Sequence, residues 1–294
     1  MKVHWIVEGG VFGEETHGLA YAVAMQGHAC TTTPKNPFFA EDRIAHLNLL
    51  LGFDIRTANE CVLYLGSCST VGWVQENTIA EPAAAWSRRD KFLCSSYYRH
   101  FGKYMMNSPY VFVQVAELIR MLDFYFDTFG NEIDGEMKIF LRSDSGSKII
   151  SGGLMTKSNI RGFFTNKRSN FAMPYDDVML LIAKPIAISR EYRLVISGKS
   201  IVTGSQYLPT ESSDIPDHVM SYANEVLENT TWDHDELCRM WTLDIAELPS
   251  TRCKVIEINS FNSSGLYKSD MKAVVKEANR LAIEDFEEYG SKTE

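Results

Sequence analysis

Apolar positions along the chain alternate between short continuous runs and runs with helical spacing. The short, β-branched runs predict strands at residues 2–7, 61–65, 137–141, 148–155, 178–188, 192–196, 200–207, 240–246 and 254–258. Apolar residues repeated every three or four positions predict helices at residues 17–27, 111–130 and 216–228, and a last helix that Ser269 caps and that ends near Tyr289. The succession of strand, glycine turn, helix and strand predicts a parallel α/β unit over roughly the first 85 residues.

Composition narrows the class of protein. The 294 residues are 45% hydrophobic, enough for a sizeable core, and the net charge of −9 argues against a protein that coats nucleic acid. Six cysteines include no Cys-x-x-Cys pair, so buried free thiols are expected rather than a zinc site. The N-terminus lacks the pattern of a signal peptide and no apolar run reaches membrane-spanning length. We therefore expect a cytoplasmic protein with no membrane partner.

The stretch from Met240 to Gly265 carries the most specific chemistry. Two predicted strands joined by a short link containing Pro249 suit an antiparallel hairpin. Side chains alternate along a strand, so Glu257 and Asn259 point to one side, and Asp244 on the partner strand can join them. Two carboxylates and an amide oxygen suit Mg²⁺ carrying nucleotide phosphates. A solvated strand face is the alternative for a Glu-x-Asn pattern by itself.

A second polar stretch, Arg142-Ser-Asp-Ser-Gly-Ser-Lys148, lies between two predicted strands. Small residues such as Ser145 and Gly146 let backbone N–H groups approach a phosphate, and the flanking Arg142 and Lys148 neutralise it. An ordinary hairpin with exposed charges is the alternative. The stretch has no Walker loop pattern.

The third stretch, residues 177–193, is an apolar strand interrupted at Lys184-Pro185. Because proline cannot donate a ladder hydrogen bond, an interrupted edge strand is expected there. Free backbone groups at Leu181, Ile182, Ala183 and Lys184 are candidates for an adenine edge, and Glu191 for ribose hydroxyls.

These three stretches, in this order, resemble the ATP-grasp superfamily over about residues 136–270. The likeness is strongest to the divergent clade that is named for an arginine and two lysines. In the resemblance, residues 142–148 are the phosphate hairpin, Ser189-Arg-Glu-Tyr-Arg193 is the Glu-Tyr-Arg strand, and Asp244, Glu257 and Asn259 are the metal ligands.

The resemblance implies a mixed α/β (α+β) ATP-grasp fold with a Rossmann-like N-terminal domain. It divides the chain into an N-terminal domain (1–88) and two ATP-grasp lobes (89–180 and 181–294). ATP and Mg²⁺ are the implied cofactors, and Arg142, Lys148 and Arg193 are the implied catalytic cations. Arg142 stands where typical ligases have a lysine, and Thr242 stands where some ligases have an arginine for the acylphosphate, with Arg193 or Arg239 as substitutes.

The implied activity is a carboxylate–amine ligase that works through an acylphosphate, with a small molecule, peptide or protein as substrate. An ATP-binding assembly chaperone, or a nucleotide-gated binding protein, is the alternative that keeps the ATP site without ligase chemistry. A metal-dependent nuclease built on Asp244 and Glu257 is a third class, and the acidic net charge argues against it.

Overall fold

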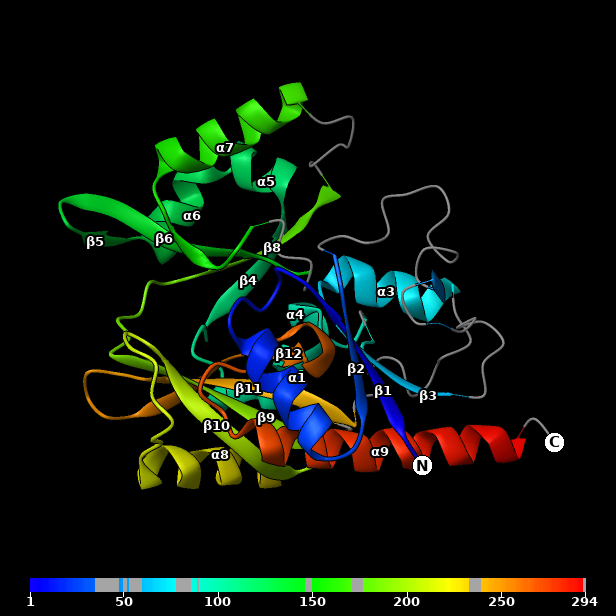
Figure 1. Ribbon diagram of the computed structural model, residues 1–294. Helices are drawn as coiled ribbons and strands as arrows, with labels where there is room; N and C mark the ends of the chain where they lie inside the picture. Colours follow the sequence, from blue (N-terminus) through cyan, green and yellow to red (C-terminus); the bar gives the residue numbers. More distant parts are fainter. Residues whose placement is uncertain are drawn as a thin grey trace.

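The structure is a computed structural model that describes residues 1–34, 48–49, 52, 60–77, 86–88, 90–145, 150–170, 177–232 and 239–292. These parts of the chain form three β-sheets with helices packed on them (Figure 1). The sheet near the N-terminus lies at the right of the view, the second sheet at the top and the third at the lower left. The mixed α/β (α+β) class predicted from the sequence is confirmed.

The N-terminal sheet is parallel, with the strand order β2-β1-β3. Its elements are β1 (Val3–Glu8), α1 (Glu15–Met25), β2 (Ala29–Thr33), β3 (Cys61–Leu65) and α3 (Cys68–Asn77). β1 pairs with a strand on each side and is almost wholly buried, which is why its sequence is a continuous apolar run. The predicted parallel unit is confirmed, although the threonine-rich β2 gave no signal in the apolar pattern.

The middle sheet has the order β4-β8-β6-β5, with β7 also paired to β6. Its elements are β4 (Tyr110–Gln114), α5 (Val115–Arg120), α6 (Leu122–Phe129), β5 (Asn131–Ile133), β6 (Glu136–Ser143), β7 (Gly153–Met155), α7 (Lys157–Asn170) and β8 (Met179–Ala183). The single helix predicted over residues 111–130 is wrong at its start, because β4 occupies residues 110–114 and the helical part is broken at Met121. Pairing with β8 overrides the local helical spacing.

The expected interrupted edge at residues 178–188 is also wrong. β8 is a central strand whose residues Leu181, Ile182 and Ala183 pair with β4 on one side and with β6 on the other. All three are fully buried, and the chain leaves the sheet only at Lys184. The proline lies just beyond the strand and therefore removes no ladder hydrogen bond from it.

The third sheet is antiparallel, with the order β10-β9-β11-β12. Its elements are α4 (Cys94–Phe101), the 3₁₀ turn η1 (Gly102–Tyr104), β9 (Arg190–Ser197), β10 (Ser200–Leu208), α8 (Asp217–Asn229), β11 (Met240–Glu247), β12 (Cys253–Ser260) and the 3₁₀ turn η3 (Phe261–Ser263). The predicted hairpin of β11 and β12 is confirmed. An aromatic core that includes residues of α4 and α8 covers one face of this sheet.

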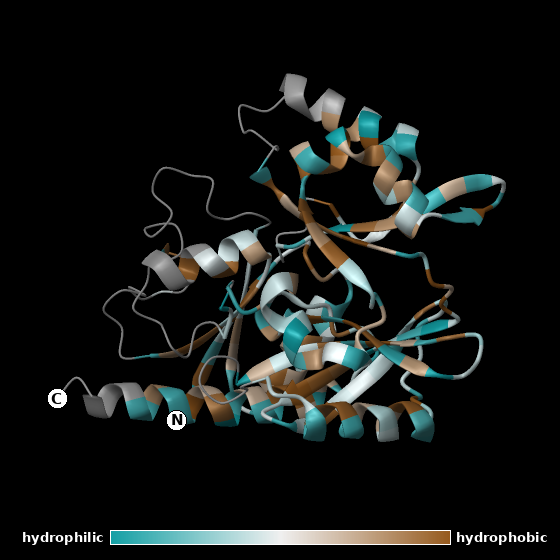
Figure 2. Cartoon of the chain, turned by 180° about the vertical axis from the view of Figure 1, so that it is seen from behind, coloured by the Kyte–Doolittle hydropathy of each residue, from teal (hydrophilic) through white to brown (hydrophobic). Residues whose placement is uncertain are grey.

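The last helix, α9 (Met271–Lys292), crosses below the third sheet and reaches the N-terminal sheet (Figure 1). Its hydrophobic and hydrophilic residues alternate along the helix (Figure 2), and Val274, Ala278 and Leu281 pack in the core of the N-terminal sheet. The predicted Ser269 cap is wrong: the side chain of Asp270 accepts the N–H groups of Lys272 and Ala273. Within the described residues, no helix combines the length and apolar character needed to cross a lipid bilayer.

Candidate active site at the junction of the three sheets

Three charged side chains stand directly opposite one another on neighbouring strands of the third sheet. The register places Arg193 of β9 against Asp244 of β11, and Asp244 against Glu257 of β12. Directly opposed residues of an antiparallel sheet project to the same face. Arg193 and Asp244 carry opposite charges, which favours a short contact between them, and Glu257 adds a second carboxylate beside Asp244.

Arg193 is held by a bidentate ion pair. Its Nε lies 2.8 Å from Asp244 Oδ1 and its Nη2 lies 2.6 Å from Oδ2, while Nη1 donates to the carbonyl of Gly265 at 3.2 Å. Burial by itself lowers the pKa of Arg193, but the carboxylate of Asp244 raises it above its ordinary value. Arg193 is therefore a buried, permanently charged guanidinium with every branch engaged.

Arg142 connects the middle sheet to the third sheet. It lies on β6, and its Nη2 donates to Glu257 Oε2 at 2.6 Å across the space between the two sheets. Both side chains are nearly buried, with 8% and 12% exposed. The structure thus brings Arg142 of the polar stretch 142–148 into contact with a carboxylate of the last hairpin.

The three predicted metal ligands lie together. Asn259 Nδ2 is 3.0 Å from Glu257 Oε1 and 3.5 Å from Asp244 Oδ2. Within the described part of the chain, no three His, Cys, Asp or Glu side chains form a metal-binding group, so two carboxylates and one amide are the donors that this place offers. Such hard oxygen donors fit Mg²⁺ when phosphate oxygens and water complete its coordination.

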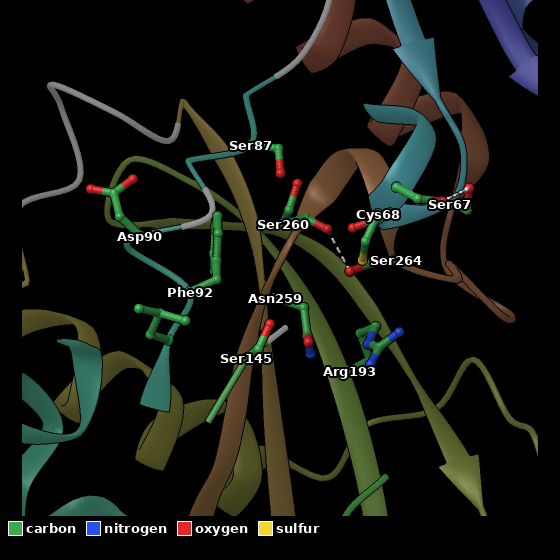
Figure 3. A pocket seen from close by; sticks show the side chains of 13 residues that line it. Ser67, Cys68, Ser87, Asp90, Phe92, Ser145, Arg193, Asn259, Ser260 and Ser264 are labelled. Carbon is green, nitrogen blue, oxygen red and sulfur yellow. Dashed lines mark hydrogen bonds between the residues drawn. The ribbon is translucent and has the colours of Figure 1, made fainter. Parts of the chain in front are cut away.

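A cavity of about 650 Å³ opens beside this row, and Arg193 and Asn259 form part of its wall (Figure 3). The other described walls come from Ser67 and Cys68 at the start of α3, from the segment around Phe92, and from the exit of β12. Ser145, the last described residue of the predicted phosphate hairpin, also lines it. The cavity therefore joins parts of all three sheets.

Glu191 lies two residues before Arg193 on the same face of β9. Tyr207 of β10 donates its hydroxyl hydrogen bond to Glu191, and the Tyr207 ring stacks on Tyr267 with the centroids 4.9 Å apart. The guanidinium of Arg193 lies 5.6 Å and 5.3 Å from the centroids of the same two rings, within cation–π range. Burial raises the pKa of Glu191 above its ordinary value.

Several predicted nucleotide-binding residues are less directly placed. The backbone of Leu181–Ala183 is buried and paired with strands on both sides, so it is not free to contact an adenine. Lys184 is exposed in the segment that links β8 to β9, so only groups at this end of β8 remain for such a contact. Gly146 and Lys148 lie outside the described residues. Asp144 lies just before them. Its carboxylate accepts hydrogen bonds of 2.7 Å from the N–H and from the hydroxyl of Ser95, at the start of α4.

The two arginines that the sequence analysis offers as substitutes at the Thr242 position lie in different surroundings. Arg239 forms ion pairs with Glu284 and Asp285 of α9, whereas Arg193 lines the cavity. Thr242 itself is fully buried, with its hydroxyl 3.1 Å from Ser264 Oγ.

Sequence reasoning missed the residues that reach the site from outside the three stretches. These include Ser67 and Cys68 on α3, Phe92, and the tyrosine pair of Tyr207 and Tyr267. The polar run that follows β3 was the available signal, because residues after the carboxyl ends of parallel strands gather at one edge of a sheet. No local pattern marks Tyr207, whose partner lies 60 residues away in the chain.

The residues of this site lie in a segment that matches a known protein family. Residues 147–278, which include Glu191, Arg193, Asp244 and Glu257, match the family described as ATP-grasp domain, R2K clade family 3. The matched part of the chain is an ATP-grasp domain. This is the clade that the sequence resemblance indicated, so that prediction is confirmed. No curated protein matches the sequence.

Solved structures agree with the ATP-grasp fold over nearly the whole chain. A RimK domain ATP-grasp protein from Sphaerobacter thermophilus DSM 20745 is 13% identical, with a TM-score of 0.56 over 95% of this chain and 98% of its own. The ATP complex of D-alanine–D-alanine ligase from Bacillus anthracis is 11% identical, with a TM-score of 0.57 over 99% of each chain. The ligase PsnB, complexed with precursor peptide PsnA2 and AMPPNP, is 9% identical, with a TM-score of 0.50 over 96% of this chain and 97% of its own. Identities this low establish the fold alone.

Proposed function

We propose that this ATP-grasp protein is an ATP-dependent ligase that activates a carboxylate as an acylphosphate and passes the acyl group to an amine or similar nucleophile. The observation that carries the proposal is the row of Arg193, Asp244 and Glu257, with Arg142 reaching it from the middle sheet. Arg193 and Asn259 line one cavity, and the carboxylates of Asp244 and Glu257 lie within hydrogen-bond distance of Asn259. The ATP-bound and peptide-bound ligases of the same fold support it.

The residues take the following proposed roles. Asp244, Glu257 and Asn259 hold Mg²⁺, and Arg142, Arg193 and Lys148 hold the phosphates, with Ser145 and Gly146 in the hairpin that covers them. Lys184, just beyond the end of β8, and Glu191 hold the adenosine part. Bound MgATP supplies the phosphoryl group, and the protein positions the reactants and stabilises negative charge through Arg142 and Arg193.

The ion pairs set a condition on binding. Arg193 and Arg142 now contact the carboxylates that are the proposed metal ligands. If the metal takes the carboxylates while the phosphates take the arginines, every buried charge keeps a partner, whereas either ligand alone would leave one set unpaired. Metal and nucleotide should therefore bind together far better than separately.

Isothermal titration and thermal unfolding test this proposal. We expect MgATP to raise the melting temperature, with a gain of about 2.7 kcal/mol when its concentration is a hundredfold above Kd. Mg²⁺ alone and ATP with EDTA should each bind much more weakly. Asp244→Asn should abolish the difference, and the exposed Asp214→Asn is the matched control. Absence of any shift with saturating MgATP would refute the ATP site.

One observation favours the alternative of an ATP-binding chaperone or nucleotide-gated protein. Some ligases have an arginine for the acylphosphate where this chain has the buried Thr242. Arg239 is paired with α9, so Arg193 would have to bind both the phosphate and the acyl group. ADP release that depends on an added carboxylic acid and amine supports the ligase. ATP binding without such release supports the alternative.

The remaining expectations belong to this proposal. We keep the division into an N-terminal domain (1–88) and two lobes (89–180 and 181–294), with residues 1–135 helping to choose the acceptor. We also keep the reducing cytoplasm as its location: the described cysteines 30, 61, 68, 94 and 253 are all free thiols.

A further inference from the structure

Tyr207 is the extra residue of a β-bulge near the end of β10. The ladder between β10 and β9 pairs Gln206 with Tyr192. The next pair is Leu208 with Glu191, so Tyr207 has no partner residue on β9. A bulge bends its strand and re-aims a side chain, and bulges are frequent beside active sites. In this bulge the hydroxyl of Tyr207 donates a hydrogen bond to Oε2 of Glu191.

Glu191 lies on the face of the third sheet that carries the proposed phosphate site. Glu191 and Arg193 are two residues apart on β9, so their side chains point to the same face. Arg193 lines the cavity (Figure 3), and its guanidinium lies 5.6 Å from the centroid of the Tyr207 ring. Glu191 is only half-buried. Its carboxylate therefore lies beside the proposed phosphate site and is accessible to a ligand.

The hydrogen bond from Tyr207 leaves one oxygen of Glu191 for such a ligand. Among the described residues, Oε2 accepts the tyrosine hydroxyl and Oε1 has no hydrogen-bond partner. Burial raises the pKa of Glu191, whereas the hydrogen bond from Tyr207 acts to lower it and so favours the ionised form. An ionised carboxylate only accepts hydrogen bonds. The geometry thus presents an oriented acceptor that suits a hydroxyl donor.

We propose that Tyr207 is a positioning residue whose hydroxyl holds the carboxylate of Glu191, so that Oε1 accepts a hydrogen bond from a ribose hydroxyl of the nucleotide. The inference rests on the proposed function in one respect, that Glu191 lies at the ribose of ATP. It adds that the protein selects ribonucleotides and that Tyr207 sets this selection. A site built to hydrogen-bond a hydroxyl rejects the analogue that lacks it, because its own polar group is then left unpaired.

Two nucleotides that differ only in their sugar hydroxyls test the inference. The binding of ATP and of 2′,3′-dideoxyATP, each with Mg²⁺, is measured by isothermal titration. We expect the wild type to prefer ATP by about tenfold or more, the equivalent of one hydrogen bond to a charged group. Tyr207→Phe keeps the ring beside Arg193 and removes only the hydroxyl. It should weaken ATP binding, leave dideoxyATP binding unchanged, and so reduce the preference to less than about threefold.

Tyr192 provides a matched control on the opposite face of the same sheet. It neighbours Glu191 on β9, is fully buried, and donates its hydroxyl to the carboxylate of Glu247 at 3.0 Å. Tyr192→Phe therefore removes the same kind of hydrogen bond away from the cavity. It should keep the wild-type preference for ATP, whatever stability it loses in thermal unfolding.

Each other outcome has a definite meaning. The inference is overturned if the wild type binds the two nucleotides equally, or if Tyr207→Phe keeps the wild-type preference. It is also overturned if Tyr207→Phe weakens both nucleotides equally, or if Tyr192→Phe loses as much of the preference as Tyr207→Phe. The proposed function fails in a different way, by the absence of MgATP binding to the wild type, and the inference then fails with it.

Discussion

Arg142 and Glu257 meet as a buried pair, so a change to either residue affects folding as well as binding. A buried charge without its partner destabilises a protein by about 3–5 kcal/mol, whereas replacing both partners by apolar residues is often neutral. Glu257→Gln should therefore lower the free energy of unfolding by a few kcal/mol and weaken MgATP binding. Arg142→Met with Glu257→Leu should recover most of the stability and none of the binding.

Urea unfolding and calorimetric titration of the wild type, the single variant and the double variant measure both effects. If the double variant is as unstable as Glu257→Gln, the pair is not the source of the loss. If it binds MgATP with wild-type affinity, Arg142 and Glu257 are structural.

Glu191 gives stability a pH dependence of known sign. Burial raises its pKa above the ordinary 4.5, with Asp244 and Glu257 adding to the shift and Tyr207 opposing it. Between the ordinary and the raised pKa, the folded protein binds more protons than the unfolded chain, so the free energy of unfolding falls as pH rises. Glu191→Gln lacks this decline, and its stability relative to the wild type should grow as pH rises from 4.

Glu277 is a control for which stability should change with pH in the opposite direction. Hydrogen bonds from Arg280 and Ser197 lower its pKa, although burial acts to raise it. Its contribution is present above the ordinary pKa and is lost as pH falls through the lowered value. Stability relative to the wild type should therefore decrease with rising pH for Glu277→Gln. Urea unfolding between pH 3 and 8 measures both, and parallel curves for the two variants would contradict the assignment.

At the scale of single residues, the sequence predicted that Asp244, Glu257 and Asn259 lie together and missed the groups around them. Strand alternation alone places Glu257 with Asn259, and a short hairpin adds Asp244. Nothing local indicates that Tyr207 contacts Glu191 or that Phe92 lines the cavity, since both depend on which segments meet in the folded protein.

Strands β9 and β10 pack closely at Gly204. A Cβ there would lie 2.7 Å from the carbonyl of Arg193 and 2.5 Å from a methyl of Leu194. Gly204→Ala should thus destabilise the protein and disturb the strand that carries Arg193. Gly162, within α7, has open space at the same position, so Gly162→Ala should stabilise by up to about 1 kcal/mol.

Thermal unfolding of the two variants, with and without MgATP, checks this contrast. Equal melting temperatures for Gly204→Ala and the wild type would show that the strands can separate there without loss. The element scale also shows where sequence prediction fails: the spacing in residues 111–130 is helical, yet pairing of β4 with the buried β8 decides the conformation of its first residues.

At the scale of the whole molecule, strong local patterns predicted the parallel N-terminal unit and the final hairpin. The packing of α9 on the N-terminal sheet was not predictable, because the pattern of an amphipathic helix shows which face is buried but not which element it packs against. Trp5 on β1 donates its indole N–H to Asn279 of α9 at 2.7 Å, and Trp86 donates to Asp285 at 2.7 Å.

The contact between Trp5 and Asn279 joins the two ends of the chain, so it forms only after the last helix has been synthesised. Trp5 leaves the ribosome 274 residues before Asn279, an interval of tens of seconds at the usual 5–20 residues per second. During this time the first sheet lacks its covering helix α9, so a chain stopped after residue 260 should show a solvent-exposed Trp5 by fluorescence quenching. A peptide of residues 261–294 added in trans should bury Trp5 again. Nascent chains of this protein would then depend on chaperones until their last helix is made.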